Sequence, residues 1–159
     1  MMIMDSHKNM RRADRQITHE ECVQIIMDNN VGVLSLGGAG GYPCGVPLNY
    51  MYYDSALYFH CAKEGRKLEL ISHDNRACFT IIGKNEVLPD EFANRFQSVM
   101  AFGSISIISD DKLKHDILIE FGKHFQYPGD KLEKYVEKRS DACHALKLDI
   151  EYMSGKMRR

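Results

Sequence analysis

The sequence contains no long apolar run. No segment approaches the roughly 20 consecutive apolar residues that a membrane-spanning helix needs, and residues 1–15 lack the apolar core of a secretory signal. The five cysteines are scattered, odd in number and without a Cys-x-x-Cys pair. We therefore expect a cytoplasmic protein whose cysteines are reduced thiols, most of them buried as small apolar residues.

The charge balance argues against a protein that binds nucleic acid through a generally basic surface. A formal net charge of −1 does not indicate a generally basic surface for nucleic acid. At 159 residues, with 44% hydrophobic and 27% charged residues, the chain has the size of one domain with its own core. We expect a polar N-terminal leader over residues 1–16 and a single domain over residues 17–159.

Familiar nucleotide and metal motifs are missing. The glycine run 37–41 is not a dinucleotide-binding fingerprint, because position 43 is proline, and it is typical of a hairpin turn. No phosphate-binding Gly-x-x-x-x-Gly-Lys-Ser/Thr segment occurs. The seven histidines show no zinc-ligand spacing, so no metal site is expected.

The sequence does contain a series of short apolar segments separated by turn signals. Strands are predicted over residues 31–36, 45–53, 56–61, 76–82, 97–108 and 145–152, with a polar excursion over 84–95. Helices are predicted from Thr18, over 63–72, over 109–121 and over 131–138. Thr18 and Glu21 form a capping-box pattern. Pro47 indicates an edge strand or bulge, and Gly103 a bulge. Six such strands favour a closed antiparallel barrel.

The segment 57–70, LYFHCAKEGRKLEL, carries the clearest chemical signal. A strand delivers His60 and Cys61, a short loop follows with Lys63, Gly65, Arg66 and Lys67, and a helix begins there. Cations beside the free N–H groups of a helix start can bind a phosphate group. The residues alone support equally a solvated basic helix start, although a cation is not the favoured charge there.

Several segments follow one another along the chain: MRRADR at 10–15, GVPLNY at 45–50, LYFH at 57–60 with GRK at 65–67, SVMAFG at 98–103, and LDIE at 148–151 with GK at 155–156. This ordered set resembles the pyridoxamine 5′-phosphate oxidase-like FMN proteins, most closely the branch of 5-nitroimidazole resistance (Nim-type) proteins. The match covers most of the chain from Met10 onward.

This resemblance implies a mainly β fold with peripheral helices, a six-stranded antiparallel split β-barrel of Greek-key type. It also implies a homodimer with FMN at the subunit interface. The implied FMN contacts are Val46, Pro47, Leu48, Asn49 and Tyr50 along the isoalloxazine, His60 and Cys61 beside it, Lys63, Arg66 and Lys67 at the phosphate, and Ser98. Cys61 departs from the family pattern, in which a hydroxyl or small residue is common, and a thiol is a weaker donor.

Three hypotheses for function follow from the resemblance. The first is an NAD(P)H-dependent oxidoreductase that reduces small acceptors such as nitro-aromatic (nitroimidazole) compounds, with His60 as a catalytic proton donor. The second is a non-enzymatic flavin-binding protein. The third is a haem-binding split barrel with His60, His124 or His144 as an axial ligand. Pyridoxamine 5′-phosphate oxidase activity itself is not expected, because segment 151–159 has no Trp and lacks that enzyme's substrate-clamping pattern.

Overall fold

The computed structural model describes residues 10–159 and contains seven strands and four α-helices in that range. Most of the predicted leader, residues 1–9, lies outside the described residues. The strands are β1 (Val31–Leu36), β2 (Cys44–Asn49), β3 (Met51–Tyr53), β4 (Ala56–Ala62), β5 (Arg76–Leu88), β6 (Ala93–Ile107) and β7 (Cys143–Arg158). The α-helices are α1 (His19–Met27), α2 (Arg66–His73), α3 (Asp111–His124) and α4 (Gly129–Arg139), and 3₁₀ turns occupy Ala13–Arg15, Pro89–Glu91 and Ser140–Ala142.

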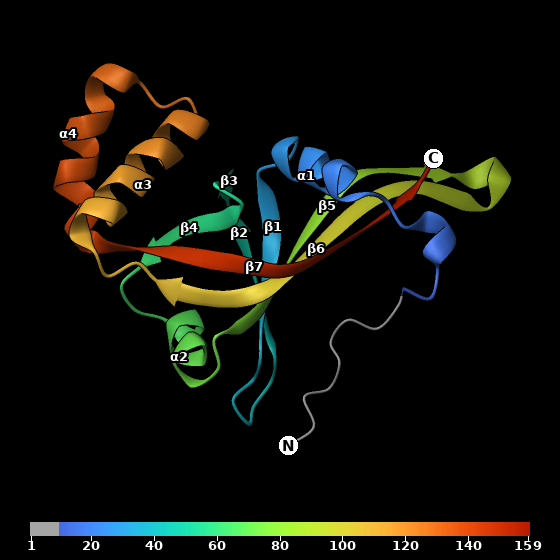
Figure 1. Cartoon of the computed structure of the whole chain (residues 1–159), viewed down its shortest axis with the longest axis horizontal. Coiled ribbons are helices and arrows are strands. Elements are labelled where there is room, and N and C mark those ends of the chain that lie inside the picture. The colour runs from blue at the N-terminus through green and yellow to red at the C-terminus, as the bar shows by residue number, and fades with distance from the viewer. Residues whose placement is uncertain (1–9) are drawn as a thin grey trace.

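All seven strands form one antiparallel sheet in the order β2-β1-β5-β6-β7-β4-β3. The architecture is the mainly β split-barrel type with helices around it, as predicted (Figure 1). The sheet is open, so the prediction of a closed barrel is wrong, and its two end strands are consecutive in the chain. These end strands, β2 and β3, are the two halves of the predicted strand 45–53, which is divided at Tyr50. Strand β2 pairs with β1, and β3 pairs with β4. This division explains why seven strands are found where six were predicted.

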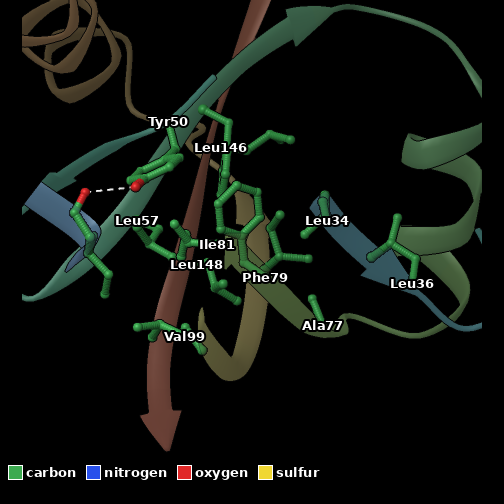
Figure 2. Packing of buried hydrophobic residues seen from close by; sticks show 14 of the residues in the cluster. Leu34, Leu36, Tyr50, Leu57, Ala77, Phe79, Ile81, Val99, Leu146 and Leu148 are labelled. Atoms are coloured by element: carbon green, nitrogen blue, oxygen red, sulfur yellow. Dashed lines mark hydrogen bonds between the residues drawn. The ribbon is translucent and has the colours of Figure 1, made fainter. Parts of the chain in front are cut away.

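The main core lies inside the curved sheet and is closed by α1. Figure 2 shows its centre, where Tyr50, Phe79 and Leu146 pack together. The phenol of Tyr50 meets the ring of Phe79 edge-on, with centroids 5.1 Å apart. Such apolar burial is the main source of stability in a domain of this size. All five cysteines are free, as expected, and Cys22 and Cys61 are buried in this core.

Local sequence rules account for the helix starts. Thr18 Oγ1 accepts a hydrogen bond from the Glu21 N–H, and the Glu21 carboxylate accepts one from the Thr18 N–H, which completes the predicted capping box. Asp110 caps α3 by accepting a hydrogen bond from the Leu113 N–H. None of the helices among residues 10–159 is long and apolar enough to cross a membrane.

The predicted polar excursion over residues 84–95 is wrong. Strands β5 and β6 continue through it as a long hairpin that projects from the rest of the sheet (Figure 1). Its residues are exposed on both faces, as with Glu86 and Val87. Because neither face of the hairpin is buried, its sequence does not alternate between apolar and polar residues. That alternation is the pattern by which half-buried strands are recognised, so these strands were not predicted.

A bulge interrupts the pairing of β6 with β7 where Gly103 predicted one. The register shifts between Phe102 and Gly103, so that Glu151 of β7 is the extra residue. A side chain at Gly103 would have no room, because its Cβ would stand 1.8 Å from the Asp149 carbonyl oxygen. The Glu151 carboxylate accepts a hydrogen bond of 2.7 Å from Ser104 Oγ beside the bulge.

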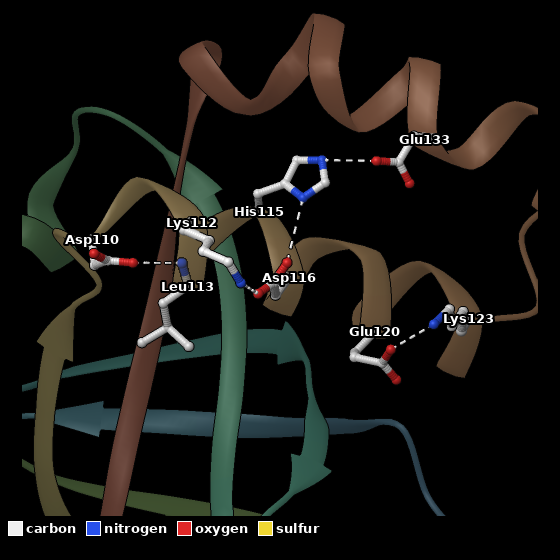
Figure 3. A network of polar contacts seen from close by, with 8 residues as sticks. All are labelled: Asp110, Lys112, Leu113, His115, Asp116, Glu120, Lys123 and Glu133. Carbon is white, nitrogen blue, oxygen red and sulfur yellow. Dashed lines mark hydrogen bonds and ion pairs between the residues drawn. The ribbon is translucent and has the colours of Figure 1, made fainter.

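Helices α3 and α4 form a hairpin that covers one end of the sheet (Figure 1). Ile117 and Phe121 of α3 pack with Tyr58 and Ala145 of the strands in a second apolar cluster. The two helices approach closely at Gly122, where an added Cβ would stand 2.3 Å from Leu132 Cδ1. Their outer faces are joined by His115 Nε2, which lies 3.4 Å from the Glu133 carboxylate (Figure 3).

Candidate functional site

Strand β2, the strand predicted to face a flavin, alternates between the core and solvent. Val46 and Leu48 are half-buried against the main core, whereas Pro47 and Asn49 are exposed on the outer face. Pro47 lies in the end strand of the sheet, which confirms the edge position inferred from its missing N–H. On the outer face a surface hollow of about 260 Å³ is lined by Pro47, Val31 and Ile82, among others.

Tyr50, the last residue of the predicted flavin-facing segment, lies inside the core. Its side chain is 1% exposed, and its hydroxyl donates a hydrogen bond of 2.7 Å to the Ile26 carbonyl oxygen (Figure 2). Burial raises the pKa of this phenol far above its ordinary value. The side chain of Tyr50 thus fixes α1 on the sheet, and any contact with a bound ligand would have to come from its backbone.

The basic loop, defined as residues 63–67, joins β4 to α2. Lys63 and Arg66 are exposed and Lys67 is half-buried. Gly65 precedes the helix with a φ of 130°, a conformation that side chains disfavour, and it provides no side-chain cap. Within residues 10–159 no ion pair or hydrogen bond engages the ends of these three cationic side chains. Three unpaired cations therefore surround an uncapped helix start.

The glycine turn between β1 and β2 lies beside this loop. The Gly41 N–H donates to the Gly38 carbonyl oxygen at 2.7 Å. Arg66 Nη2 lies 3.6 Å from the position that a Cβ on Gly41 would take. Sequence reasoning interpreted the run 37–41 only as a hairpin turn, and did not connect it to the basic loop. Nothing in the local sequence shows that two segments 25 residues apart meet here.

His60 and Cys61 extend from opposite faces of β4. Cys61 faces the main core, where burial raises the pKa of its thiol and the charge of Lys67 partly offsets that effect. His60 faces α3, and its ring meets Phe121 edge-on with centroids 4.8 Å apart. Although the imidazole is open to solvent on one side, the apolar groups around it lower its pKa. The two side chains therefore cannot contact one face of the same ligand.

Ser98, the remaining predicted contact, lies in a different part of the sheet. It is half-buried on β6 and pairs with Ile82 and Lys156. Six residues separate it from Ser104, which pairs with Arg76 just after α2. At about 3.3 Å per residue, Ser98 stands about 20 Å along the sheet from the α2 end of β6. Within one chain Ser98 therefore lies far from the basic loop.

A cavity of about 230 Å³ opens between β4 and the α3–α4 hairpin, and we refer to it as the α3–α4 cavity. Phe121, Leu132 and Val136 line its apolar part. His60, Tyr135 and Arg139 line its more exposed part. Sequence analysis predicted a helix over residues 131–138 but did not identify this site. Leu132, Val136 and Arg139 are spaced by four and three residues, which places them on one helix face.

The three histidines proposed as haem ligands do not form a common site. His144 pairs with Cys61 and so extends from the face opposite His60. His124 meets Phe125 edge-on near the end of α3. In the described part of the chain no group of three or more His, Cys, Asp or Glu side chains could hold a metal ion.

Comparison with known proteins identifies the family. Residues 18–157 match the family model described as pyridoxamine 5′-phosphate oxidase. The chain belongs to the pyridoxamine 5′-phosphate oxidase family. The family match spans every strand of the sheet except the last residue of β7. No curated protein sequence matches the chain at a significant level.

Solved structures of similar fold include proteins described as flavin-binding. A protein from Bacteroides thetaiotaomicron that is described, without an established role, as a 5-nitroimidazole antibiotic resistance protein is 22% identical with a TM-score of 0.73, covering 89% of this chain and 86% of that one. An FAD-binding protein from Mesorhizobium loti is 22% identical with a TM-score of 0.66, covering 91% and 98%. An FAD and haem binding protein from Mycobacterium smegmatis is 20% identical with a TM-score of 0.76, covering 91% and 74%. These likenesses show that this member of the pyridoxamine 5′-phosphate oxidase family has the same fold as the three proteins.

Proposed function

We propose that the protein binds FMN and acts as an NAD(P)H-dependent oxidoreductase that reduces small acceptors such as nitro-aromatic compounds. The observation that carries this proposal is the basic loop, whose three cations surround the start of α2 and have no acidic partner among residues 10–159. Family membership and similarity to flavin-binding proteins support the same assignment.

The charge of the loop favours FMN over FAD. A phosphate monoester carries about −1.5 to −2 charges at neutral pH, whereas each phosphate in the diphosphate bridge of FAD carries about one. Arg66 can bind a phosphate in bidentate fashion, and Lys63 and Lys67 supply point charges beside it. The terminal phosphate of FMN therefore matches this loop better than the internal phosphates of FAD.

The outer face of β2 and its neighbours supports a homodimer with the flavin between subunits. Val31, Ile82 and Met100 are exposed there, at 51%, 64% and 40%. Apolar side chains gathered on one sheet face typically mark an interaction surface. A second chain packed on this face would bury these side chains and could enclose a flattened ring that lies along β2. Ser98, on the same sheet but far from the basic loop, would then reach the flavin across the interface.

Bound FMN would accept a hydride from reduced nicotinamide and pass electrons to the acceptor. The residues of the chain would bind and orient it, the basic loop at the phosphate and the backbone of residues 46–50 along the ring. His60 is the residue we assign as a proton donor during acceptor reduction. Because its pKa is lowered, the imidazole is mostly neutral at pH 7 and would take up the proton from solvent before each transfer.

Absorbance spectra before and after addition of FMN test the cofactor. The wild-type protein should show flavin peaks and bind FMN more tightly than FAD. Arg66→Ala with Lys67→Ala should weaken FMN binding by about a hundredfold or more, since each charge-assisted contact contributes about 1.5–3 kcal/mol. The matched control is Lys131→Ala with Lys134→Ala, two exposed cations on α4. A folded protein that takes up no FMN would exclude the proposal.

Oxidation of NADH or NADPH with a nitro-aromatic acceptor tests the reaction separately. Reduced nicotinamide should bleach the flavin, and the acceptor should restore its absorbance. His60→Gln should reduce acceptor turnover while FMN affinity stays unchanged. Tight FMN binding without bleaching by either nicotinamide would instead identify a flavin-binding protein that is not this kind of enzyme.

A further inference from the structure

The α3–α4 cavity has the features of a second ligand site, distinct from the segments expected to hold a flavin. We propose that it binds a single-ring aromatic carboxylate, with the ring among Phe121, Leu132 and Tyr135 and the carboxylate on Arg139. This proposal goes beyond the proposed function. Residues 46–50 and 63–67 do not line the cavity, and His60 is the one residue that the two proposals share.

The size of the cavity fits one substituted ring. An apolar cavity of about 150 Å³ is known to hold benzene, and the α3–α4 cavity measures about 230 Å³. Its inner residues Phe121, Leu132 and Val136 are each about 5% exposed, so they form a preformed apolar pocket. The difference in volume leaves room for a substituent about the size of a carboxylate.

The aromatic lining favours a planar ligand. The ring of Phe121 already receives the edge of the His60 imidazole on one side and stacks on Phe125 on another, with centroids 4.9 Å apart. Tyr127 and Tyr135 line the more exposed part of the cavity. Aromatic rings that meet edge-on or offset contribute about 0.5–1.5 kcal/mol beyond area burial. An aliphatic ligand of the same volume would lose that contribution.

The charges around the cavity favour an anion. Arg139 lies with its guanidinium carbon 6.0 Å from the centre of the Tyr135 ring, and no ion pair among the described residues involves it. No aspartate or glutamate lines the cavity. A guanidinium held over an aromatic ring keeps its N–H groups free at its edge, where a carboxylate can accept two parallel hydrogen bonds.

His60 adds a second polar group on the opposite wall. It makes no hydrogen bond among the described residues, and its ring meets Phe121 edge-on. A neutral imidazole can donate one hydrogen bond to a ring substituent. The ideal ligand therefore carries its carboxylate at one end and a small hydrogen-bond acceptor at the other.

Ligand-observed ¹⁹F NMR with 4-fluorobenzoate tests the proposal on the purified full-length protein. The wild-type protein should broaden and shift the fluorine signal and bind neutral 4-fluorobenzamide at least tenfold more weakly. Arg139→Gln should weaken 4-fluorobenzoate binding by about tenfold or more, as loss of a charge-assisted hydrogen bond predicts. Affinity for 4-fluorobenzamide should not change in that variant.

Two further variants locate the binding. Lys138→Gln removes the neighbouring cation on α4, which is exposed and does not line the cavity, and should leave binding at the wild-type level. Ala142→Phe places a bulky side chain in the cavity lining and should abolish binding of both probes. Absence of 4-fluorobenzoate binding, or equal loss in Lys138→Gln and Arg139→Gln, would overturn the proposal. No nicotinamide or acceptor is added, so failure of the flavin chemistry would leave these outcomes unaffected.

Discussion

The hydroxyl of Tyr50 joins two elements that are distant in sequence. Replacing Tyr50 by Phe removes its hydrogen bond to the Ile26 carbonyl oxygen but keeps the ring against Phe79. We expect a loss of about 1 kcal/mol in the free energy of unfolding, the usual net value of one such bond. Urea denaturation measures it. Tyr53→Phe, at an exposed tyrosine, is the control and should change stability little, and an equal loss in both variants would contradict the assigned role.

The lowered pKa of His60 predicts a dependence of stability on pH. Since the pKa is about 6.5 in an unfolded chain and lower in the folded protein, the unfolded state binds more protons as the pH falls through this range. His60 therefore makes the folded protein less stable below about pH 6.5, and has no such effect above it.

Denaturation at pH 7.5 and pH 5.5 checks this expectation. The loss of stability between the two values should be smaller in His60→Asn than in the wild-type protein. His73→Asn, at an exposed histidine at the end of α2, is the control. If His60→Asn loses as much stability as the wild-type protein, His60 is not the group whose desolvation matters.

Residue-level rules succeeded where the deciding partners lie within one helical turn. The cap by Thr18 with Glu21 and the cap by Asp110 depend on residues three positions apart, so the sequence is sufficient. The position of His60 next to Cys61 could have predicted their opposite directions from the alternation of a strand. Which of the two side chains faces the core could not be predicted, because Phe121 of α3 comes 61 positions after His60.

At the scale of elements, the bulge between β6 and β7 tolerates no side chain at Gly103. Gly103→Val would place Cβ against the Asp149 carbonyl oxygen, so the two central strands would have to separate. We expect a loss of about 3 kcal/mol or more, in the range of severe core substitutions. Gly129→Ala at the start of α4, where nothing lies within 4 Å of the added Cβ, is the control and should be neutral or slightly stabilising. Thermal unfolding compares them.

The strands that could be predicted from the sequence are those with one face buried and one face exposed. Strands β1 and β4 have one face on the core and were recognised with nearly their observed bounds. The outer half of the β5–β6 hairpin has no buried face, so its hydrophobic pattern is that of a loop. The division of one predicted strand at Tyr50 also left no local signal, because it follows from pairing with β1 on one side and β4 on the other.

At the scale of the whole molecule, the exposed apolar face predicts self-association. Ile82→Lys places a charge in the centre of that face and should convert a dimer into a monomer. FMN affinity should fall with it, since the flavin is proposed to lie between subunits. Leu113→Lys is the control at an exposed apolar residue of α3, remote in the chain. Light scattering gives the mass, and a wild-type protein that is monomeric at all concentrations would contradict the prediction.

In the candidate sites too, features within one segment could be predicted from the sequence, whereas contacts between distant segments could not. The basic loop lies within one segment, so its cations could be located from the sequence, although the residues alone supported a solvated helix start equally. The α3–α4 cavity joins His60 of β4 with Arg139, 79 positions later in the chain. No pattern in the sequence predicts that Phe121 and Val136 close the space between them, because helix packing at Gly122 decides it.

The order of strands in the sheet has a consequence for biosynthesis. Strand β7 is the last element of the chain, yet it lies between β6 and β4 in the sheet. While the chain emerges from the ribosome, β4 has no partner for its second edge until residues 143–149 appear. Open strand edges and long-range pairings favour aggregation and slow folding. The sheet should therefore be unable to complete its pairing until β7 has been translated.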